Sequence, residues 1–387
     1  MALEFHFVLA LALVYGTSFV FAWLRRYDIP ILAVEILAGI VFGATLGLVN
    51  DGTAGYDFFV SLAAFGLLMI MFDAGLELDP EIIRRDPVRV TALAVSTFLL
   101  PFAAGFGLGQ FLDLSLFASF LTGVTVSTTS LGLIYPLLED FDLLDTDRGQ
   151  VILAVAVMND ILSVAVLAYG LTLATSDTPI VGVGVVTAAL AFFFLVLPFA
   201  LSPHIANTLR DGVFENPAKA GVFLMVALAF FLEHLGIHAI LGAFFAGLLV
   251  AIVTRDGHDV EESMQPVTDL TAPVFFFYVG TNIHLDSIAA APLLLGGVLV
   301  VGLGTKALGA LIGGLAAGIE NRTTLLLAAA MPGRLSISVA AAEIGRSQGI
   351  ISDQLYQAFV LLSVVSVFAS VLAFRYLVDT PTAGAAA

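Results

Sequence analysis

The chain has 387 residues, of which 60% are hydrophobic and 12% are charged, and its mean hydropathy is +1.06. Soluble domains carry charges at roughly a quarter of their positions, so this composition indicates a protein that crosses a membrane many times. The net charge of −17 and the absence of cysteine exclude a basic nucleic-acid surface, disulfides and thiolate metal sites.

Thirteen apolar stretches have the length of a membrane-spanning helix. No positively charged segment precedes the first, so we predict a membrane helix there and not a cleaved signal peptide. The stretches cover residues 5–24, 31–49, 57–76, 88–110, 114–137, 149–173, 179–201, 218–235, 237–254, 267–283, 290–318, 322–345 and 354–377. We therefore predict an all-α polytopic membrane protein with 13 transmembrane helices. It would form a single transmembrane domain, residues 1–387, without a soluble regulatory domain.

The positive charges of the loops predict the direction of these helices. Eleven of the 14 Lys and Arg residues fall in loops on one side of the predicted membrane, and Arg346 falls on the other side. Cytoplasmic loops carry the excess of positive charge, so the N-terminus is predicted outside and the C-terminus in the cytoplasm. We accordingly expect a multi-pass protein of the cell membrane.

Two of the stretches contain residues that interrupt helices. Residues 127–130 of the fifth stretch are Ser or Thr, whose hydroxyls compete for backbone hydrogen bonds. Residues 331–336 of the twelfth read MPGRLS, in which Pro removes a donor and Gly permits a break. An ordinary kink, bonded within its own helix, is the alternative for each.

The two interruptions lie seven stretches apart, and this odd offset makes the interrupted helices run in opposite directions. Interrupted helices at corresponding positions of two halves are typical of transporters built from inverted repeats. We predict repeats over residues 5–173 and 218–377, joined by a linker helix at 179–201.

Asp160 lies in the middle of an otherwise apolar stretch. A charge at that depth costs about 2.5–3.5 kcal/mol on insertion scales, so Asp160 is the leading candidate for a functional group. Asp73, Lys306 and Arg334 are the other charges near the predicted midplane, and we expect these two acids and two bases to compensate one another's charge. A static salt bridge between Asp73 and Arg334 is the structural alternative.

A buried carboxylate can bind either a proton or a hard cation such as Na⁺ or K⁺. Oxygen ligands suit such cations, and Thr129, Ser130 and unwound backbone carbonyls would complete the coordination of a cation at Asp160. Asn159, next to that carboxylate, belongs to the same candidate site.

The acidic residues gather in loops, and Lys occurs only at positions 219 and 306. An acidic, lysine-poor surface would suit a cytoplasm of high salt concentration and predicts a halophilic source. Compositional drift is the alternative interpretation.

Four segments carry a resemblance to a known family. They are residues 30–40 (PILAVEILAGI), 67–78 (LLMIMFDAGLEL), 236–248 (GIHAILGAFFAGL) and 273–280 (PVFFFYVG). They resemble the monovalent cation:proton antiporter superfamily, most closely its second branch, which includes Na⁺/H⁺ antiporters and Kef-like K⁺ systems. The resemblance covers essentially the whole membrane domain.

The resemblance implies roles for individual residues. Asp160 matches the aspartate that binds the ion and the proton, and Thr129 matches the threonine where the first discontinuous helix crosses the second. Lys306 and Arg334 match a lysine of the bacterial antiporters and the arginine of the second discontinuous helix. The family further implies a homodimer, alternating access by a moving core module, a part in pH homeostasis, and no cofactor beyond the transported ions.

Three positions, Asn159, Lys306 and Ser130, depart from the family pattern, and Ser130 stands where electroneutral members have Asp. Asn159 precedes Asp160 where many electrogenic members have a second aspartate, and Asn-Asp is typical of electroneutral exchangers. Electroneutral members usually lack the lysine, yet Lys306 is present and has lost its usual acidic partner. The resemblance therefore favours electroneutral exchange but leaves the charge state of Lys306 open.

These observations predict a secondary antiporter that exchanges Na⁺ or K⁺ for H⁺ at a shared carboxylate. The alternatives are a Kef-like K⁺ efflux system with a separate cytoplasmic regulatory subunit, and a sensor built on the same fold. We do not predict an enzyme, because the Gly-x-Gly-Asp motif of intramembrane aspartyl proteases is absent.

Overall fold

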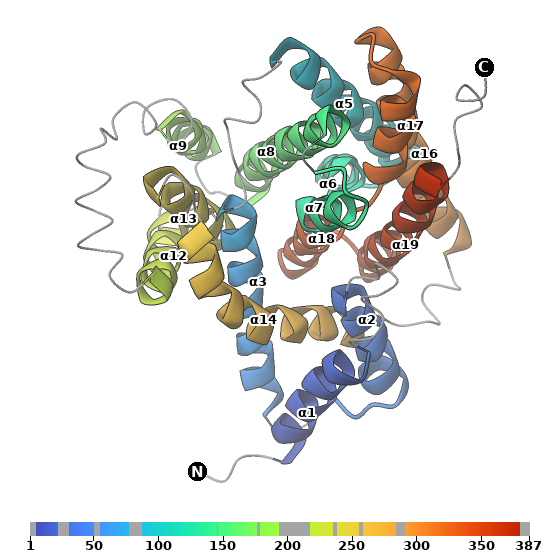
Figure 1. Ribbon diagram of the computed structural model, residues 1–387. Coiled ribbons are helices and arrows are strands. Elements are labelled where there is room, and N and C mark those ends of the chain that lie inside the picture. Colours follow the sequence, from blue (N-terminus) through green and yellow to red (C-terminus); the bar gives the residue numbers. More distant parts are fainter. Residues whose placement is uncertain are drawn as a thin grey trace. The chain divides into compact units, whose positions relative to one another are not determined.

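A computed structural model describes residues 5–21, 31–49, 55–76, 87–144, 146–175, 179–192, 217–234, 238–254, 258–283 and 291–379. Every regular element within these ranges is a helix, so the predicted all-α fold is confirmed (Figure 1). The helices are α1 (Phe5–Val20), α2 (Ile31–Ala38) continued by the π-helix η2 (Gly39–Thr45), α3 (Tyr56–Leu76), α5 (Pro87–Phe111), α6 (Leu116–Ser127), α7 (Leu131–Asp140), α8 (Asp147–Thr175), α9 (Pro179–Ala191), α12 (Pro217–His234), α13 (Ala239–Thr254), α14 (His258–Thr281), α16 (Pro292–Ala316), α17 (Asn321–Ala330), α18 (Ser336–Ser347) and α19 (Asp353–Asp379).

Each of the thirteen predicted stretches contains a helix or an interrupted helix. The start of α14 differs most from its predicted position: the helix begins at His258 and not at residue 267. Its first turns are polar, so a search for apolar stretches does not include them. Six helical segments of the described part, one of them the interrupted pair α6 and α7, are long and apolar enough to cross a membrane. The exact number of crossings therefore stays a prediction.

The predicted orientation also stays a prediction. Most of the loop arginines that carry it lie outside the described residues, as do most of the loops between residues 51 and 57 and between 202 and 217. The undescribed arginines are Arg25, Arg26, Arg84, Arg85, Arg210 and Arg255.

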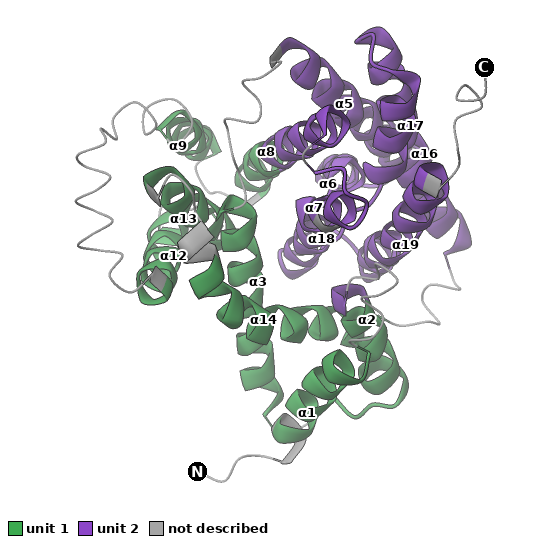
Figure 2. Ribbon diagram, viewed as in Figure 1, with its two compact units in different colours: residues 1–21, 34–79, 164–283 green, residues 22–33, 80–163, 284–387 purple. Residues whose placement is uncertain are grey.

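The chain divides into two compact units, each assembled from both halves of the sequence (Figure 2). Unit 1 comprises residues 1–21, 34–79 and 164–283, and unit 2 comprises residues 22–33, 80–163 and 284–387. Unit 2 thus contains α5 to α7, the first part of α8, and α16 to α19. Both interrupted helices belong to unit 2. One comes from the first half of the chain and the other from the second half.

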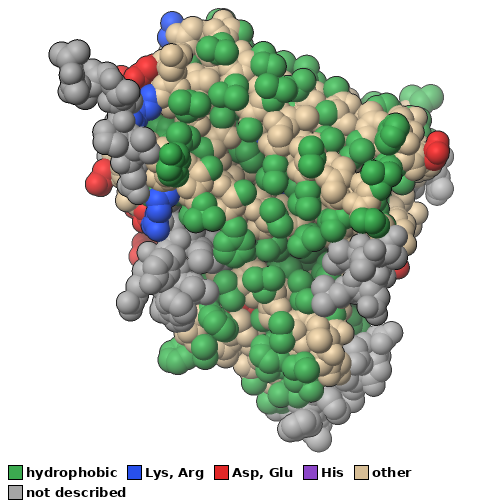
Figure 3. All heavy atoms as spheres, turned by 90° about the vertical axis from the view of Figure 1, so that its right-hand side faces the viewer, with side chains coloured by type: hydrophobic (Ala, Val, Ile, Leu, Met, Phe, Trp, Pro, Cys, Tyr) green, Lys and Arg blue, Asp and Glu red, His purple; other side chains and the backbone are tan. Residues whose placement is uncertain are grey.

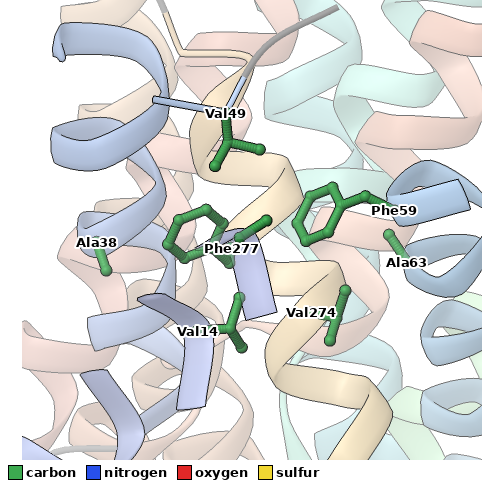
Figure 4. Packing of buried hydrophobic residues seen from close by; sticks show 8 residues of the cluster. Val14, Ala38, Val49, Phe59, Ala63, Val274 and Phe277 are labelled. Atoms are coloured by element: carbon green, nitrogen blue, oxygen red, sulfur yellow. The ribbon is translucent and has the colours of Figure 1, made fainter. Parts of the chain in front are cut away.

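Glycines let the helices of unit 1 approach closely. A Cβ at Gly247 of α13 would lie 1.9 Å from the carbonyl oxygen of Phe72 on α3, so only glycine fits there. At the other end of the unit, Val14, Phe59 and Phe277 belong to a buried apolar cluster (Figure 4). The rings of Phe59 and Phe277 pack edge to face, with their centroids 6.2 Å apart.

In unit 2, α16 presents different residues to its two sides. Its exposed side carries large apolar residues about two turns apart, namely Leu293, Val300, Leu308 and Leu315. Its buried side carries Lys306 and glycines, and Ser96 of α5 donates a hydrogen bond to the carbonyl of Gly309 at 3.1 Å. Figure 3 shows a face on which hydrophobic side chains predominate and charged ones lie toward the margins, as expected for a surface in contact with lipid.

Candidate ion-binding site

The two interruptions lie where the sequence predicts them. Helix α6 ends at Ser127 and α7 begins at Leu131, with extended backbone between them: Thr128 has φ −60° and ψ 160°. Helix α17 ends at Ala330 and α18 begins at Ser336. Each interruption leaves the carbonyls of one half-helix and the N–H groups of the next without their usual partners.

Backbone and side-chain hydrogen bonds join the two interruptions. The N–H of Ser130 donates to the carbonyl of Gly333 at 3.0 Å, and the hydroxyl of Thr129 donates to the carbonyl of Met331 at 3.3 Å. A Cβ at Gly333 would lie 2.3 Å from Cδ2 of Leu133, so a larger residue there would have to displace that side chain. The discontinuous helices therefore cross at these residues, as the sequence resemblance implies.

Charged side chains lie at the open ends of the half-helices. At the C-terminal end of α6, the carbonyl of Val126 accepts from Nη1 of Arg334 at 2.7 Å, and that of Ser127 accepts from Nζ of Lys306. The N–H of Leu131, at the N-terminal end of α7, interacts with the carboxylate of Asp160. Basic side chains thus lie at the negative end of one helix dipole, and a carboxyl group lies at the positive end of the next.

Arg334 is fully buried, and its guanidinium connects three segments of unit 2. Besides Val126, it donates to the carbonyls of Pro332 at 3.0 Å and Gly302 at 2.7 Å. Backbone carbonyls therefore accept the side-chain hydrogen bonds of Arg334 within unit 2. Asp73 lies half-buried in α3 of unit 1. The pairing of Asp73 with Arg334, which the sequence offers as an alternative, stays a prediction.

Lys306 is bonded to the residue that replaces its usual acidic partner. Its Nζ donates to Oδ1 of Asn159 at 2.9 Å, and Nδ2 of Asn159 donates to Oγ1 of Thr97 at 2.9 Å. The lysine, the amide and the hydroxyl are all completely buried. Thr97 was not among the predicted site residues, because nothing in the apolar sequence of α5 distinguishes it from a helix-packing threonine.

Asp160 is 3% exposed, and its Oδ1 has no hydrogen-bond partner among the described residues. The buried hydroxyls of Ser163 and Thr125 are likewise unpartnered in that part of the chain. Ser163 follows Asp160 by three residues on α8, which places both on neighbouring positions of one helix face. This spacing was visible in the sequence and could have added Ser163 to the predicted site.

Of the predicted ligands, the structure places Asp160, Thr129 and Ser130 in unit 2, at or beside the crossing. Thr129 keeps lone pairs on its oxygen after its proton is donated to Met331. Ser130 is 5% exposed and its side chain does not cap α7. Buried oxygens that lack protein donors are costly when left alone, and they suit a desolvated proton or a hard cation.

Comparison with known proteins points in the same direction. The family described as "Sodium/hydrogen exchanger, transmembrane" matches residues 9–378. The Na(+)/H(+)-K(+) antiporter GerN of Bacillus cereus is 27% identical over 372 residues, which are 95% of this chain and 94% of the relative. A Na(+)/H(+) antiporter of Enterococcus hirae is 26% identical over 360 residues, 91% of this chain and 92% of the relative.

A solved structure has the same fold. The sodium proton antiporter MjNhaP1 from Methanocaldococcus jannaschii superposes with a TM-score of 0.72 at 19% sequence identity. The superposition covers 96% of this chain and 97% of that protein. Since the family match extends over nearly the entire sequence, the chain belongs to the transmembrane sodium/hydrogen exchanger family.

Proposed function

We propose that the protein is a secondary antiporter that exchanges a monovalent cation, Na⁺ or K⁺, for H⁺, with Asp160 as the shared site. The observation that carries this proposal is the buried carboxylate of Asp160, whose Oδ1 is unpartnered within the described residues. The names of the relatives, Na(+)/H(+) and Na(+)/H(+)-K(+) antiporters, support it. A Kef-like K⁺ efflux system is the alternative.

The chemistry of exchange follows from that one carboxylate. A buried charge without a partner is costly, so Asp160 is neutralised either by a cation or by a proton. Thr129 and Ser163 contribute oxygens to the cation, while Ser130 and the open carbonyls at the crossing are further candidates. Because the two ions compete for the same oxygen atoms, release of one accompanies binding of the other, and alternating access then gives antiport.

The arrangement of the cations favours electroneutral exchange. Arg334 is held by backbone carbonyls, and Lys306 is held by the Asn159 amide and the Ser127 carbonyl. Neither depends on a hydrogen bond to Asp160 to keep its place. If both stay fixed while one cation replaces one proton, no net charge moves in a cycle, and membrane potential should not change the rate.

Purified protein in liposomes with an imposed pH gradient tests both statements. We expect addition of Na⁺ or K⁺ to collapse the gradient, reported by a pH-sensitive dye, and the preferred ion to be the one that acts at lower concentration. Repeating the assay with the potential clamped at zero and at a set value should give the same rate. No collapse with either ion would refute antiport, and a rate that follows the potential would refute electroneutrality.

Thr129→Ala is expected to raise the apparent KM for the cation by about 3- to 10-fold, the size of one lost ligand oxygen. Thr128→Ala is the matched control, because Thr128 is equally buried but its hydroxyl donates to the carbonyl of Thr125 in its own segment at 2.9 Å. An unchanged KM in Thr129→Ala would remove Thr129 from the site.

We also propose that the protein forms a homodimer in the cell membrane, as the family resemblance implies. Light scattering of the detergent-solubilised protein should give a protein mass of twice 40.6 kDa. A monomeric mass at all concentrations would contradict this.

A further inference from the structure

Asn159 is bonded on both sides of its amide by groups of other helices. Its Oδ1 accepts from Nζ of Lys306 on α16 at 2.9 Å. Its Nδ2 donates to Oγ1 of Thr97 on α5 at 2.9 Å and to the carbonyl of Val155, one turn earlier on α8, at 3.0 Å. Both N–H groups of the amide are thereby used, and its oxygen faces the ammonium group.

The hydroxyl of Thr97 and the carbonyl of Val155 together fix which way this amide turns. Its proton is donated to the carbonyl of Leu93 at 2.8 Å on the same helix, with Ala94 as a second acceptor at 3.1 Å. Only lone pairs of Thr97 therefore face Asn159, and these can receive an N–H but not a carbonyl oxygen. The opposite orientation would set the amide nitrogen against the ammonium of Lys306 and the amide oxygen against the Thr97 lone pairs.

The direction of the amide matters because Lys306 and Asp160 lie close enough for their charges to interact. An ammonium group that leaves Asn159 would find the unpartnered Oδ1 of Asp160 as an alternative acceptor. There it would occupy the same oxygen that a cation needs. The bonds to Asn159 and to the Ser127 carbonyl keep the ammonium away from that oxygen.

We propose that Thr97 is a positioning residue for cation binding: together with the Val155 carbonyl it fixes the Asn159 amide and, through that amide, retains Lys306 so that Asp160 stays open to the cation. This inference rests on the proposed function of Asp160. It concerns a residue of α5 that does not itself coordinate the ion.

Thr97→Val removes the hydroxyl and keeps the shape of the side chain. We expect the apparent KM for Na⁺ to rise about 5-fold while kcat changes by less than about 2-fold, because one hydrogen bond that opposes competition by Lys306 is lost. Thr97→Ser should restore the wild-type KM. Thr97→Ala provides a second test of the same loss if the valine variant folds poorly.

Thr122→Val is the matched control for the chemical change. Thr122 of α6 is as buried as Thr97, and its hydroxyl donates to the carbonyl of Ala118 on its own helix at 2.7 Å. The apparent KM of Thr122→Val for Na⁺ should remain that of the wild type. An equal rise in KM in Thr97→Val and Thr122→Val would show that the loss of any buried hydroxyl, and not the position of Asn159, raises the KM.

A double-mutant comparison tests whether Thr97 acts through the lysine. In a Lys306→Gln background, Thr97→Val should have no further effect on Na⁺ binding, because no ammonium group is left to compete. Na⁺ binding is measured as the difference in melting temperature between NaCl and choline chloride at equal concentration. This measurement also works for variants that do not transport. The same loss of binding in both backgrounds, or an unchanged KM in Thr97→Val, would overturn the inference. Absence of exchange in the wild type would instead refute the proposed function.

Discussion

Asp160→Asn is expected to reduce cation-driven proton movement to the background of empty liposomes. The amide has nearly the shape of the carboxylate, yet it can neither bind and release a proton nor supply a charge to a cation. The rise in melting temperature in NaCl over choline chloride should disappear together with transport. The elution volume of the variant should stay that of the wild type, which separates loss of the site from loss of the fold.

Glu320→Gln is the matched control for this change. Glu320 precedes α17 and forms an exposed pair with Arg148, with nitrogen and oxygen 2.8 Å apart. Neutralising a carboxylate there should leave exchange within about 2-fold of the wild type, because exposed pairs contribute little. Exchange that persists in Asp160→Asn would show that another group carries the proton.

Arg334→Met is expected to cause the largest loss of stability among single substitutions in unit 2. The apolar side chain fills similar space but leaves the carbonyls of Val126, Gly302 and Pro332 buried without a donor. Each unsatisfied buried group costs about 1–3 kcal/mol, so for the three carbonyls we expect a total loss of about 3–9 kcal/mol. A fall of about 5–10 °C in melting temperature would correspond to it.

Arg148→Met serves as the control, since its side chain is 40% exposed and should cost less than about 1 kcal/mol. Arg334→Lys should fall between the wild type and Arg334→Met, because lysine keeps the charge but cannot reproduce the planar set of donors. A wild-type melting temperature in Arg334→Met would contradict the role of this arginine in joining the interruptions.

The local features of the site could be predicted from the sequence. Runs of hydroxyl residues at 127–130 and the Pro-Gly pair at 332–333 weaken a helix wherever they occur, so both interruptions were found. Asp160 stands out because a carboxylate in an apolar stretch is costly irrespective of its neighbours. The family motifs are likewise contiguous segments, and they led to the relation that the comparisons establish.

The partners of the buried charges were decided only by tertiary structure. Arg334 bonds to Val126, 208 residues away, and Asn159 bonds to Thr97, 62 residues away. From residue types alone, a carboxylate such as that of Asp73 is the obvious partner for Arg334. A backbone carbonyl exists at every position, and only the folded crossing shows which carbonyls a helix break has left open to an arginine or a lysine.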